Sequence, residues 1–249
     1  ADNLASGKGV YVCNNIQEGI IAINEIFNGK FGKAKNILIE EFLNGEEMSF
    51  FTIHDGNNFK FFGTAQDHKR VKEKDKGPNT GGMGAYSPAK IINKKIERKI
   101  LNKIVKPTLL ALKKSKKYYR GFLYVGLMIK DNKPYLIEYN VRMGDPECQV
   151  ILPRLKTDIL TIIINTINNK LHKTKIIWRK EKCMTIVLCS KGYPGNYKKN
   201  KLIKDIDKIK LQNNEIIFHA GTKTQGKKIF SNGGRVLNFT SLGNNFFRI

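Results

Sequence analysis

Hydrophobic residues along this chain recur with two spacings, one typical of helices and one typical of strands. Apolar positions at Ile16, Ile20, Ile23 and Phe27 predict an amphipathic helix. Residues 92–109 show the same period, and Pro107 is expected to kink or restart that second helix. Short apolar runs beside turn residues predict strands at residues 10–13, 36–43, 45–53, 122–129 and 135–141. The first strand, the first helix and the next strand pair predict a small α/β lid.

Beyond about residue 172 the pattern changes. Apolar runs at residues 184–189, 216–222 and 233–239 are separated by turn sequences such as Lys191-Gly192-Tyr193-Pro194-Gly195. No helical period intervenes among them. These runs predict a small, mostly antiparallel β domain at residues 173–249, after a larger domain at residues 1–172. His219, in the second of these strands, has no nucleophile beside it in sequence and is expected to be a packing or capping residue.

The predicted hairpin at residues 122–141 carries candidate metal ligands. Alternation along its second strand places Leu136, Glu138 and Asn140 on one face. A carboxylate and an amide oxygen this close together suit Mg²⁺, which takes few protein ligands and keeps other positions for water and phosphate oxygens. A Glu on an apolar hairpin also fits a structural ion pair, and the residues alone leave that alternative open.

Residues 66–88 contain the densest cluster of chemistry-bearing positions. Gln66-Asp67-His68-Lys69-Arg70 is followed by Gly77-Pro78-Asn79-Thr80-Gly81-Gly82-Met83-Gly84-Ala85-Tyr86-Ser87-Pro88. Four glycines between residues 77 and 84 allow backbone N–H groups to approach a ligand and permit positive φ values. Composition alone is more typical of an ordinary Gly/Asn/Pro surface loop, whereas the length and order of this motif favour an anion-binding loop.

Charge and cysteine usage change this picture little. The formal net charge of +24, from 45 Lys+Arg and 21 Asp+Glu, favours a polyanion partner such as nucleic acid. The excess is dispersed lysine, mixed with Asn and Ile, which predicts weak non-specific attraction rather than specific nucleic-acid binding. Cys13, Cys148, Cys183 and Cys189 lack metal-ligand or disulfide spacing and are expected to be free thiols in a reducing compartment. No run reaches the roughly 18 apolar residues of a membrane span.

The glycine-rich segment resembles the substrate loop of phosphoribosylamine–glycine ligase, an ATP-grasp enzyme of purine biosynthesis. The resemblance continues on both sides of the loop in family order, which makes it far more specific than a short pattern. The other matching blocks are ADNLASGKGV, ILIEEFLNGEEMSFF, GFLYVGLMI, LIEYNVRMGDPECQ, SKGYPGNY, FHAGTK and SNGGRVL.

This resemblance implies an α/β (α+β) ATP-grasp fold with a small C-terminal antiparallel β domain. The lid is expected at about residues 1–58. In the family a nucleotide-fold-like domain and a phosphate-contacting lysine precede the position of Ala1, and both are missing here. The chain is therefore expected to be a fragment or a reduced version, with its C-terminal domain truncated.

The resemblance also implies roles for individual residues. Gly7, Lys8 and Gly9 would form the flexible loop over the ATP phosphates. Adenine would meet the connector at Glu41, Phe42 and Leu43, while Glu47 would take the ribose hydroxyls. Glu138 and Asn140 would hold the metal. Catalytic roles fall to Asp67, Lys69, Arg70 and Arg142, and substrate contacts to Asn79, Thr80, Gly81, Gly82, Met83, Gly84 and Asp145.

Asp145-Pro146 predicts a helix N-cap followed by Pro at the first helical position.

The activity implied by the resemblance is ATP-dependent joining of glycine to 5-phosphoribosylamine through glycyl phosphate, with Mg²⁺ or Mn²⁺. Expected properties are a cytoplasmic location, a monomer or weak homodimer, small-molecule substrates, and no specific nucleic-acid or membrane partner. Another ATP-grasp carboxylate–amine ligase, a nucleic-acid-binding protein and an inactive ATP-binding fragment are the alternatives.

Overall fold

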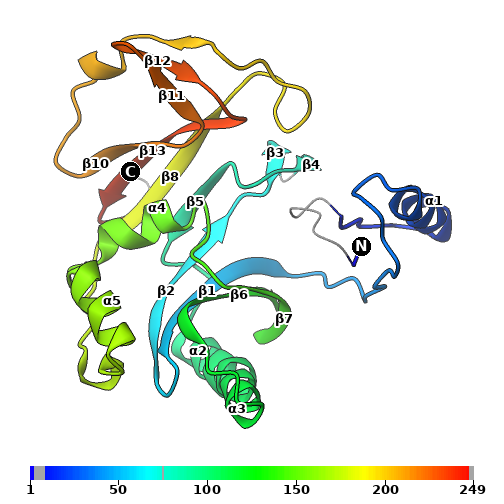
Figure 1. Ribbon diagram of the computed structural model, residues 1–249, viewed down its shortest axis with the longest axis vertical. Coiled ribbons are helices and arrows are strands. Elements are labelled where there is room, and N and C mark those ends of the chain that lie inside the picture. The colour runs from blue at the N-terminus through cyan, green and yellow to red at the C-terminus, as the bar shows by residue number, and fades with distance from the viewer. Residues whose placement is uncertain (3–8, 75, 247–249) are drawn as a thin grey trace. The chain divides into compact units, whose positions relative to one another are not determined.

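The computed structural model describes residues 1–2, 9–74 and 76–246, and it divides the chain into two compact units (Figure 1). The first unit comprises Ala1–Asn44 and the second Gly45–Ile249.

The first unit is built around the predicted N-terminal helix, α1 (Ile16–Phe27). Asn15 caps it, since its side chain accepts a hydrogen bond from the Glu18 N–H at 2.9 Å. Ala22 and Ile26 are its buried residues, whereas Ile16, Ile20 and Phe27 of the predicted stripe are exposed. The prediction of a helix is confirmed, but the apolar stripe is not the face that the helix buries.

The predicted strands at residues 10–13 and 36–43 are wrong. Both segments are irregular, and Val10, Leu38 and Ile39 are largely exposed. A strand satisfies its backbone groups only by pairing with a neighbour. Among the described residues of this unit, the sole bridge joins Lys30 and Gly32, so neither segment pairs as a strand. Apolar composition alone does not make a strand.

The second unit contains an eight-stranded sheet, visible in Figure 1. It confirms the predicted hairpin around residues 122–141, the strand at 45–53 and three C-terminal strands, all of which pair antiparallel with their neighbours. In spatial order the strands are β10 (Glu215–His219), β13 (Arg235–Gly243), β8 (Lys182–Cys189), β5 (Gly84–Ser87), β2 (Phe59–Asp67), β1 (Glu46–Asp55), β6 (Arg120–Lys130) and β7 (Lys133–Asn140).

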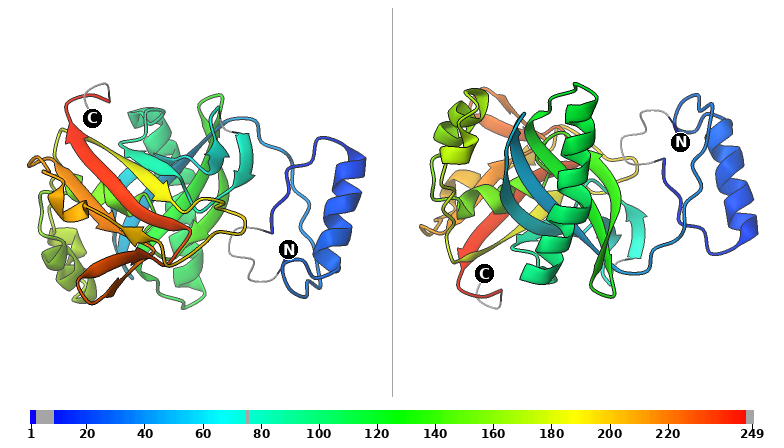
Figure 2. Two further views of the ribbon diagram at one scale, coloured as in Figure 1. Left: turned by 90° about the horizontal axis from the view of Figure 1, so that it is seen from above. Right: turned by 90° about the horizontal axis from the view of Figure 1, so that it is seen from below.

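Helices cover both faces of the β2–β1–β6 region (Figure 2). One face packs Phe50, Val125 and Leu127 against α2 (Lys94–Ile100), the π-helical turn Leu101–Val105 and α3 (Lys106–Lys114). The π turn ends two residues before Pro107 and confirms the predicted interruption. The other face packs Phe51 and Phe62 against α4 (Cys148–Ile151) and α5 (Ile159–Ile167).

Shorter elements complete this unit. A hairpin of β3 (Arg70–Lys72) and β4 (Lys76–Asn79) opens the glycine-rich segment. A separate sheet in the C-terminal part has the order β11 (Thr222–Gln225), β12 (Lys228–Ser231) and β9 (Leu202–Ile203). Three single-turn 3-10 helices lie at Leu152–Arg154, Leu171–Lys173 and Ile206–Lys208.

The pairing of β5 with β8 makes one sheet from strands on both sides of residue 172. The boundaries 1–172 and 173–249, and the lid at 1–58, stay predictions. The four cysteines are free thiols. Among the described residues, every helix is too short or too polar to cross a membrane.

Candidate active site

One end of a sheet face is polar, and its side chains come from adjacent strands. Ser49 of β1 pairs with Gly126 of β6, which pairs with Glu138 of β7. Two pairs further along, Tyr124 lies opposite Asn140. A Cβ on Gly126 would lie 3.3 Å from Glu138 Cγ, so the glycine leaves space for the Glu138 side chain. The predicted shared orientation of Glu138 and Asn140 is confirmed, because Asn140 Nδ2 lies 2.9 Å from Glu138 Oε1.

The alternation that predicted this pair is interrupted by a bulge. Gly126 pairs with Glu138, but the next residue of β6, Leu127, pairs with Leu136, so Ile137 is an extra residue. The expected face containing Leu136, Glu138 and Asn140 therefore does not run regularly through the strand. The bulge separates Leu136 from the two polar positions.

Lys69 is surrounded by carboxylates. Its ammonium forms an ion pair with Glu47. Burial alone would lower the pKa of Lys69, but Asp67, Glu47 and Glu138 reverse that effect and raise it above the ordinary value. Burial, together with the charges of Glu147 and Glu47, raises the pKa of Asp67 to about 7, although Lys69 opposes the shift. Three carboxylates therefore act on one ammonium in a chain of high positive charge.

Glu147 belongs to a buried hydrogen-bonded group on the same sheet face. Its residue is 2% exposed, and Oε1 lies 3.0 Å from Ser49 Oγ. Ser49 Oγ also lies 2.8 Å from Tyr124 Oη. Burial and the charges of Glu147 and Asp67 raise the pKa of Tyr124, so this phenol keeps its proton. A Cβ on Gly144 would lie 2.4 Å from Glu147 Oε2, so this glycine makes room for the carboxylate.

The glycine-rich segment runs from β4 to β5 with most of its backbone engaged. Thr80 N–H donates to Lys69 O at 2.7 Å, and Met83 N–H donates to His68 O at 2.7 Å. Gly82 N–H donates to Thr80 Oγ1 at 3.0 Å. Gly82 has φ +111°, and an added Cβ would lie 2.4 Å from Pro146 Cδ. This position requires glycine both for its conformation and for the close approach of Pro146.

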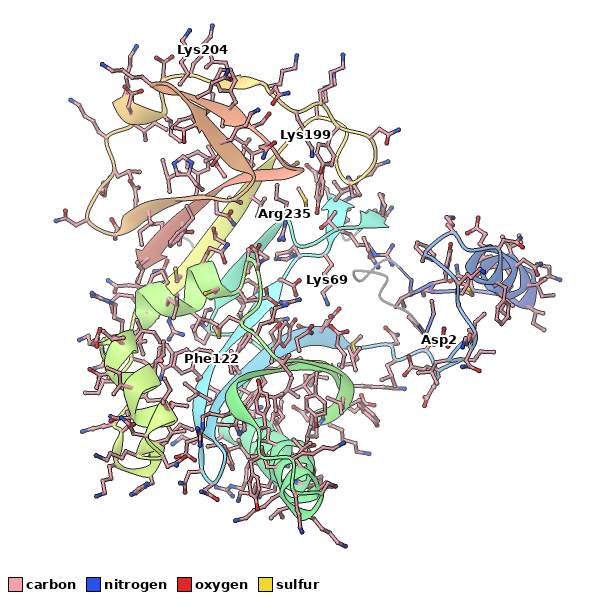
Figure 3. The ribbon with its side chains drawn as sticks, in the orientation of Figure 1. Asp2, Lys69, Phe122, Lys199, Lys204 and Arg235 are labelled. Atoms are coloured by element: carbon pink, nitrogen blue, oxygen red, sulfur yellow. The ribbon has the colours of Figure 1, made fainter. Side chains whose placement is uncertain are left out.

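Arg235, at the start of β13, ties this segment to the turn at Asp145. Its Nη1 donates to Gly81 O at 2.6 Å and to Asp145 O at 2.7 Å. Its Nη2 lies 3.1 Å from Asp145 Oδ2. Lys69 and Arg235 are both labelled in Figure 3 and come from widely separated parts of the chain.

The donor set of Glu138 and Asn140 fits a divalent cation that prefers oxygen ligands. Among the described residues, no group of three or more His, Cys, Asp or Glu side chains could hold a metal. Two protein oxygens suit Mg²⁺, whose remaining positions are commonly filled by water and phosphate. The excess of carboxylates around Lys69 also favours a cation at this end of the sheet.

Other predicted residues lie as follows. Arg142 follows β7 and is exposed, and its Nη2 lies 3.4 Å from Asn140 Oδ1. Arg70 donates to Gly77 O at 3.3 Å and pairs with Asn79 between β3 and β4. Glu41, Phe42 and Leu43 lie in the first unit, in irregular backbone, as does Gly9, which is buried. Gly7 and Lys8 lie outside the described residues.

The predicted N-cap at Asp145 is wrong. The Asp145–Pro146 peptide is cis, and the helix begins at Cys148 after Glu147. Asp145 instead accepts hydrogen bonds from Arg235 and from Gln149 Nε2, the latter at 2.8 Å. These partners take the place of the helix N–H groups that an N-cap would receive.

Sequence reasoning assigned no site role to Glu147, Ser49, Tyr124, Arg235 or Tyr193. Each lies within or beside a block that resembles the family, but the partners are far apart in the chain. Ser49 and Glu147 are 98 residues apart, and Arg235 and Gly81 are 154 apart. Local spacing therefore contains no signal for these contacts.

Residues 1–148 match the family described as the phosphoribosylglycinamide synthetase ATP-grasp (A) domain, and residues 183–248 match the C domain of the same synthetase. The chain belongs to the phosphoribosylglycinamide synthetase family. The ATP-grasp prediction for the fold is thereby confirmed, together with its antiparallel C-terminal strands. The two matched regions pair within one sheet. β5 lies in the ATP-grasp match, and it pairs with β8, which begins at the start of the C-domain match.

Similar proteins support this membership. A phosphoribosylamine–glycine ligase of Agrobacterium fabrum is 46% identical over 246 residues, which are 98% of this chain and 58% of that protein. The ligase of Vigna unguiculata is 43% identical over 98% of this chain and 80% of that protein. The crystal structure of the Thermotoga maritima ligase superposes with a TM-score of 0.86 at 35% identity, covering 99% of this chain and 61% of that chain.

Several bacterial relatives are considerably longer than the chain. It spans 57% of the matching ligase of Brucella melitensis and 58% of that of Agrobacterium fabrum.

Proposed function

We propose that this chain contributes the ATP-grasp and C-terminal parts of a ligase that joins glycine to 5-phosphoribosylamine, with ATP as the energy source. The observation that carries the proposal is the polar sheet face, where Glu138 and Asn140 lie on the strand beside β6 and Lys69 is surrounded by carboxylates. Its occurrence in a phosphoribosylglycinamide synthetase chain supports this choice of substrates.

The reaction proposed has two chemical steps. A glycine carboxylate oxygen attacks the γ-phosphorus of ATP, which gives glycyl phosphate and ADP. The ribosylamine nitrogen then attacks the glycyl carbonyl carbon, and phosphate leaves with the electrons of the C–O bond. No covalent bond to the protein is needed, so positioning and charge stabilisation are the main contributions of the side chains.

Individual side chains suit these tasks. Glu138 and Asn140 would hold Mg²⁺ or Mn²⁺, which when bound neutralises phosphate charge. Lys69, oriented by Glu47, would stabilise negative charge on the transferred phosphoryl group. A carboxylate oxygen of Asp67, whose pKa is about 7, is suited to accept the proton that the attacking amine loses. Arg142 lies beside Asn140 and would bind an anionic substrate group.

The glycine-rich segment, from Asn79 to Gly84, and Asp145 would shape the substrate site together with Arg70. The adenine contacts at Glu41, Phe42 and Leu43, the ribose contact at Glu47, and the phosphate loop at Gly7, Lys8 and Gly9 remain predictions. We also propose a cytoplasmic location, a monomer or weak homodimer, and no specific nucleic-acid or membrane partner.

A substrate-omission assay tests this function. The chain is incubated with ATP, Mg²⁺, glycine and freshly prepared 5-phosphoribosylamine, and release of ADP is followed. We expect ADP release to require both glycine and the amine. Release that proceeds with another carboxylate but not with glycine would favour a different carboxylate–amine ligase. Nucleotide binding without turnover would favour an inactive ATP-binding fragment.

A further inference from the structure

Both backbone polar groups of Gly81, its N–H and its carbonyl, are held by side chains from the C-terminal part of the chain. Its N–H donates to Tyr193 Oη at 2.9 Å, and its carbonyl accepts from Arg235 Nη1 at 2.6 Å. A Cβ at this position would lie 2.9 Å from Arg235 Cζ, so the guanidinium packs directly on the glycine. Tyr193 and Arg235 thus set the position of the loop backbone.

The backbone donors of this loop are already engaged. Thr80 and Met83 donate to the carbonyls of Lys69 and His68, while Gly82 donates to Thr80 Oγ1. We expected these N–H groups to face an anion, but in this conformation they have acceptors within the protein. A ligand that meets this loop must therefore contact side chains or displace one of these partners.

The hydroxyl groups of Thr80 and Tyr193 each accept an N–H of the loop, but they differ in the use of their own proton. Thr80 Oγ1 also donates its proton to Lys69 O, at 2.6 Å, so both of its roles are filled. Tyr193 Oη accepts from Gly81, and across residues 9–74 and 76–246 no recorded hydrogen bond uses its proton. An N–H donated to a phenol oxygen polarises that phenol and strengthens it as a donor. Tyr193 therefore presents an O–H that is both positioned and available.

Packing fixes the direction of this hydroxyl. A Cβ on Gly234 would lie 2.2 Å from Tyr193 Cδ2, so the ring lies directly against that glycine. Tyr197 contacts the ring edge to face, with centroids 6.1 Å apart. Tyr193 N–H donates to Ser190 O at 3.0 Å. With the ring and the backbone both held, little rotational freedom is lost when a ligand binds.

We propose that the Tyr193 hydroxyl donates a hydrogen bond to a phosphate-monoester oxygen of the phosphoribosyl substrate, and that Arg235 is a positioning residue that holds Gly81 and Asp145 for this contact. The proposal rests on the proposed function for the identity of the substrate. In that reaction the glycine carboxylate must react beside Lys69 and Glu138. The phosphate of the sugar is the anion that does not react. Tyr193 contacts the loop at Gly81, and the preceding residue, Thr80, donates its N–H to the Lys69 carbonyl.

Calorimetric titration of the chain with ribose 5-phosphate tests the contact without requiring turnover. Tyr193→Phe keeps the ring and removes one O–H, and we expect about tenfold or greater loss of affinity, as for other hydrogen bonds to charged groups. Tyr197→Phe is the matched control and should bind like the original chain. Titration with glycine should not distinguish the two variants. Thermal melting of each variant checks that the fold is retained.

Arg235→Lys provides a second test that does not remove the proposed contact. Where turnover is measurable, it should raise KM for the ribosylamine more than it lowers kcat, because the loop is displaced rather than the reacting groups. Equal affinity of Tyr193→Phe and the original chain for ribose 5-phosphate would overturn the proposal, as would a loss of glycine affinity instead. Tyr193-dependent binding without ADP release would refute the proposed function and leave this subsite standing. Glycine-dependent ADP release, with no effect of Tyr193→Phe on ribose 5-phosphate affinity, would refute the subsite and leave the proposed function standing.

Discussion

The hydroxyl of Ser49 lies 3.0 Å from the carboxylate of Glu147, joining the middle of β1 to the segment that follows β7. Ser49 is 1% exposed and Glu147 is 2% exposed, so water cannot readily replace a lost partner. This contact holds a buried carboxylate at the polar end of the sheet, where it acts on Asp67.

Removing the Ser49 hydroxyl should destabilise the protein. We expect Ser49→Ala to lower the free energy of unfolding by about 1–3 kcal/mol, because a buried carboxylate loses a hydrogen-bond donor. Urea unfolding measures the change. Ser115→Ala, at the exposed C-terminal end of α3, should change stability by less than about 0.5 kcal/mol. In the double variant with Glu147→Gln, additive losses would argue against a Ser49–Glu147 interaction.

Gly82 should not tolerate a side chain. Gly82→Ala combines a backbone at φ +111° with a Cβ placed 2.4 Å from Pro146 Cδ. We expect the free energy of unfolding to fall by about 2–4 kcal/mol, from backbone strain and overpacking together. Thermal melting is the measurement, and Gly19→Ala in α1 is the control because nothing lies within 4 Å of its added Cβ. Equal melting temperatures for the two variants would contradict the loop geometry.

His54 should make the protein less stable in acid. Burial lowers its pKa from 6.5 to about 4, although Asp55 opposes the shift. Between these pH values the unfolded state binds more protons, so the His54 contribution is present above pH 6.5 and is lost as pH falls toward 4. The linked change is about 3 kcal/mol. The stability difference between the original chain and His54→Phe should follow this course, and a difference independent of pH would refute it.

Asp67 should have the opposite effect on the pH dependence of stability. Its pKa rises from 3.8 to about 7, so its favourable contribution is complete below pH 3.8 and is lost as pH rises through 7. Asp67→Asn should therefore gain stability relative to the original chain between pH 4 and 8, while losing turnover. Unfolding curves across this range measure the gain. Asp207→Asn, an exposed control, should show no such trend.

Glu138 should be required for divalent-cation binding. Glu138→Ala removes one of two oxygen ligands, and Mn²⁺ titration in the presence of nucleotide should show at least tenfold weaker binding. Turnover in the substrate-omission assay should be abolished. Glu97→Ala, at a half-buried position in α2, is the control and should leave both unchanged. Normal activity in Glu138→Ala would reject the metal assignment.

Sequence reasoning worked best where local pattern and long-range pairing agree. The hairpin of β6 and β7 alternates regularly enough to place Glu138 and Asn140 together, and its Asp131–Asn132 turn has the positive φ values that these residues tolerate. The segments at 10–13 and 36–43 have similar apolar runs but no described partner strand, and the prediction failed there.

By itself, the sequence determined the family, the helix α1, the interruption at Pro107 and the hairpin of β6 and β7, because each depends on residues close together. Tertiary structure alone decided that Glu147 is buried against Ser49, that Arg235 and Tyr193 hold Gly81, and that Asp145 bonds Arg235 instead of capping a helix. These contacts join residues that are far apart in the chain. Their partners are selected by sheet order and burial, which no local spacing records.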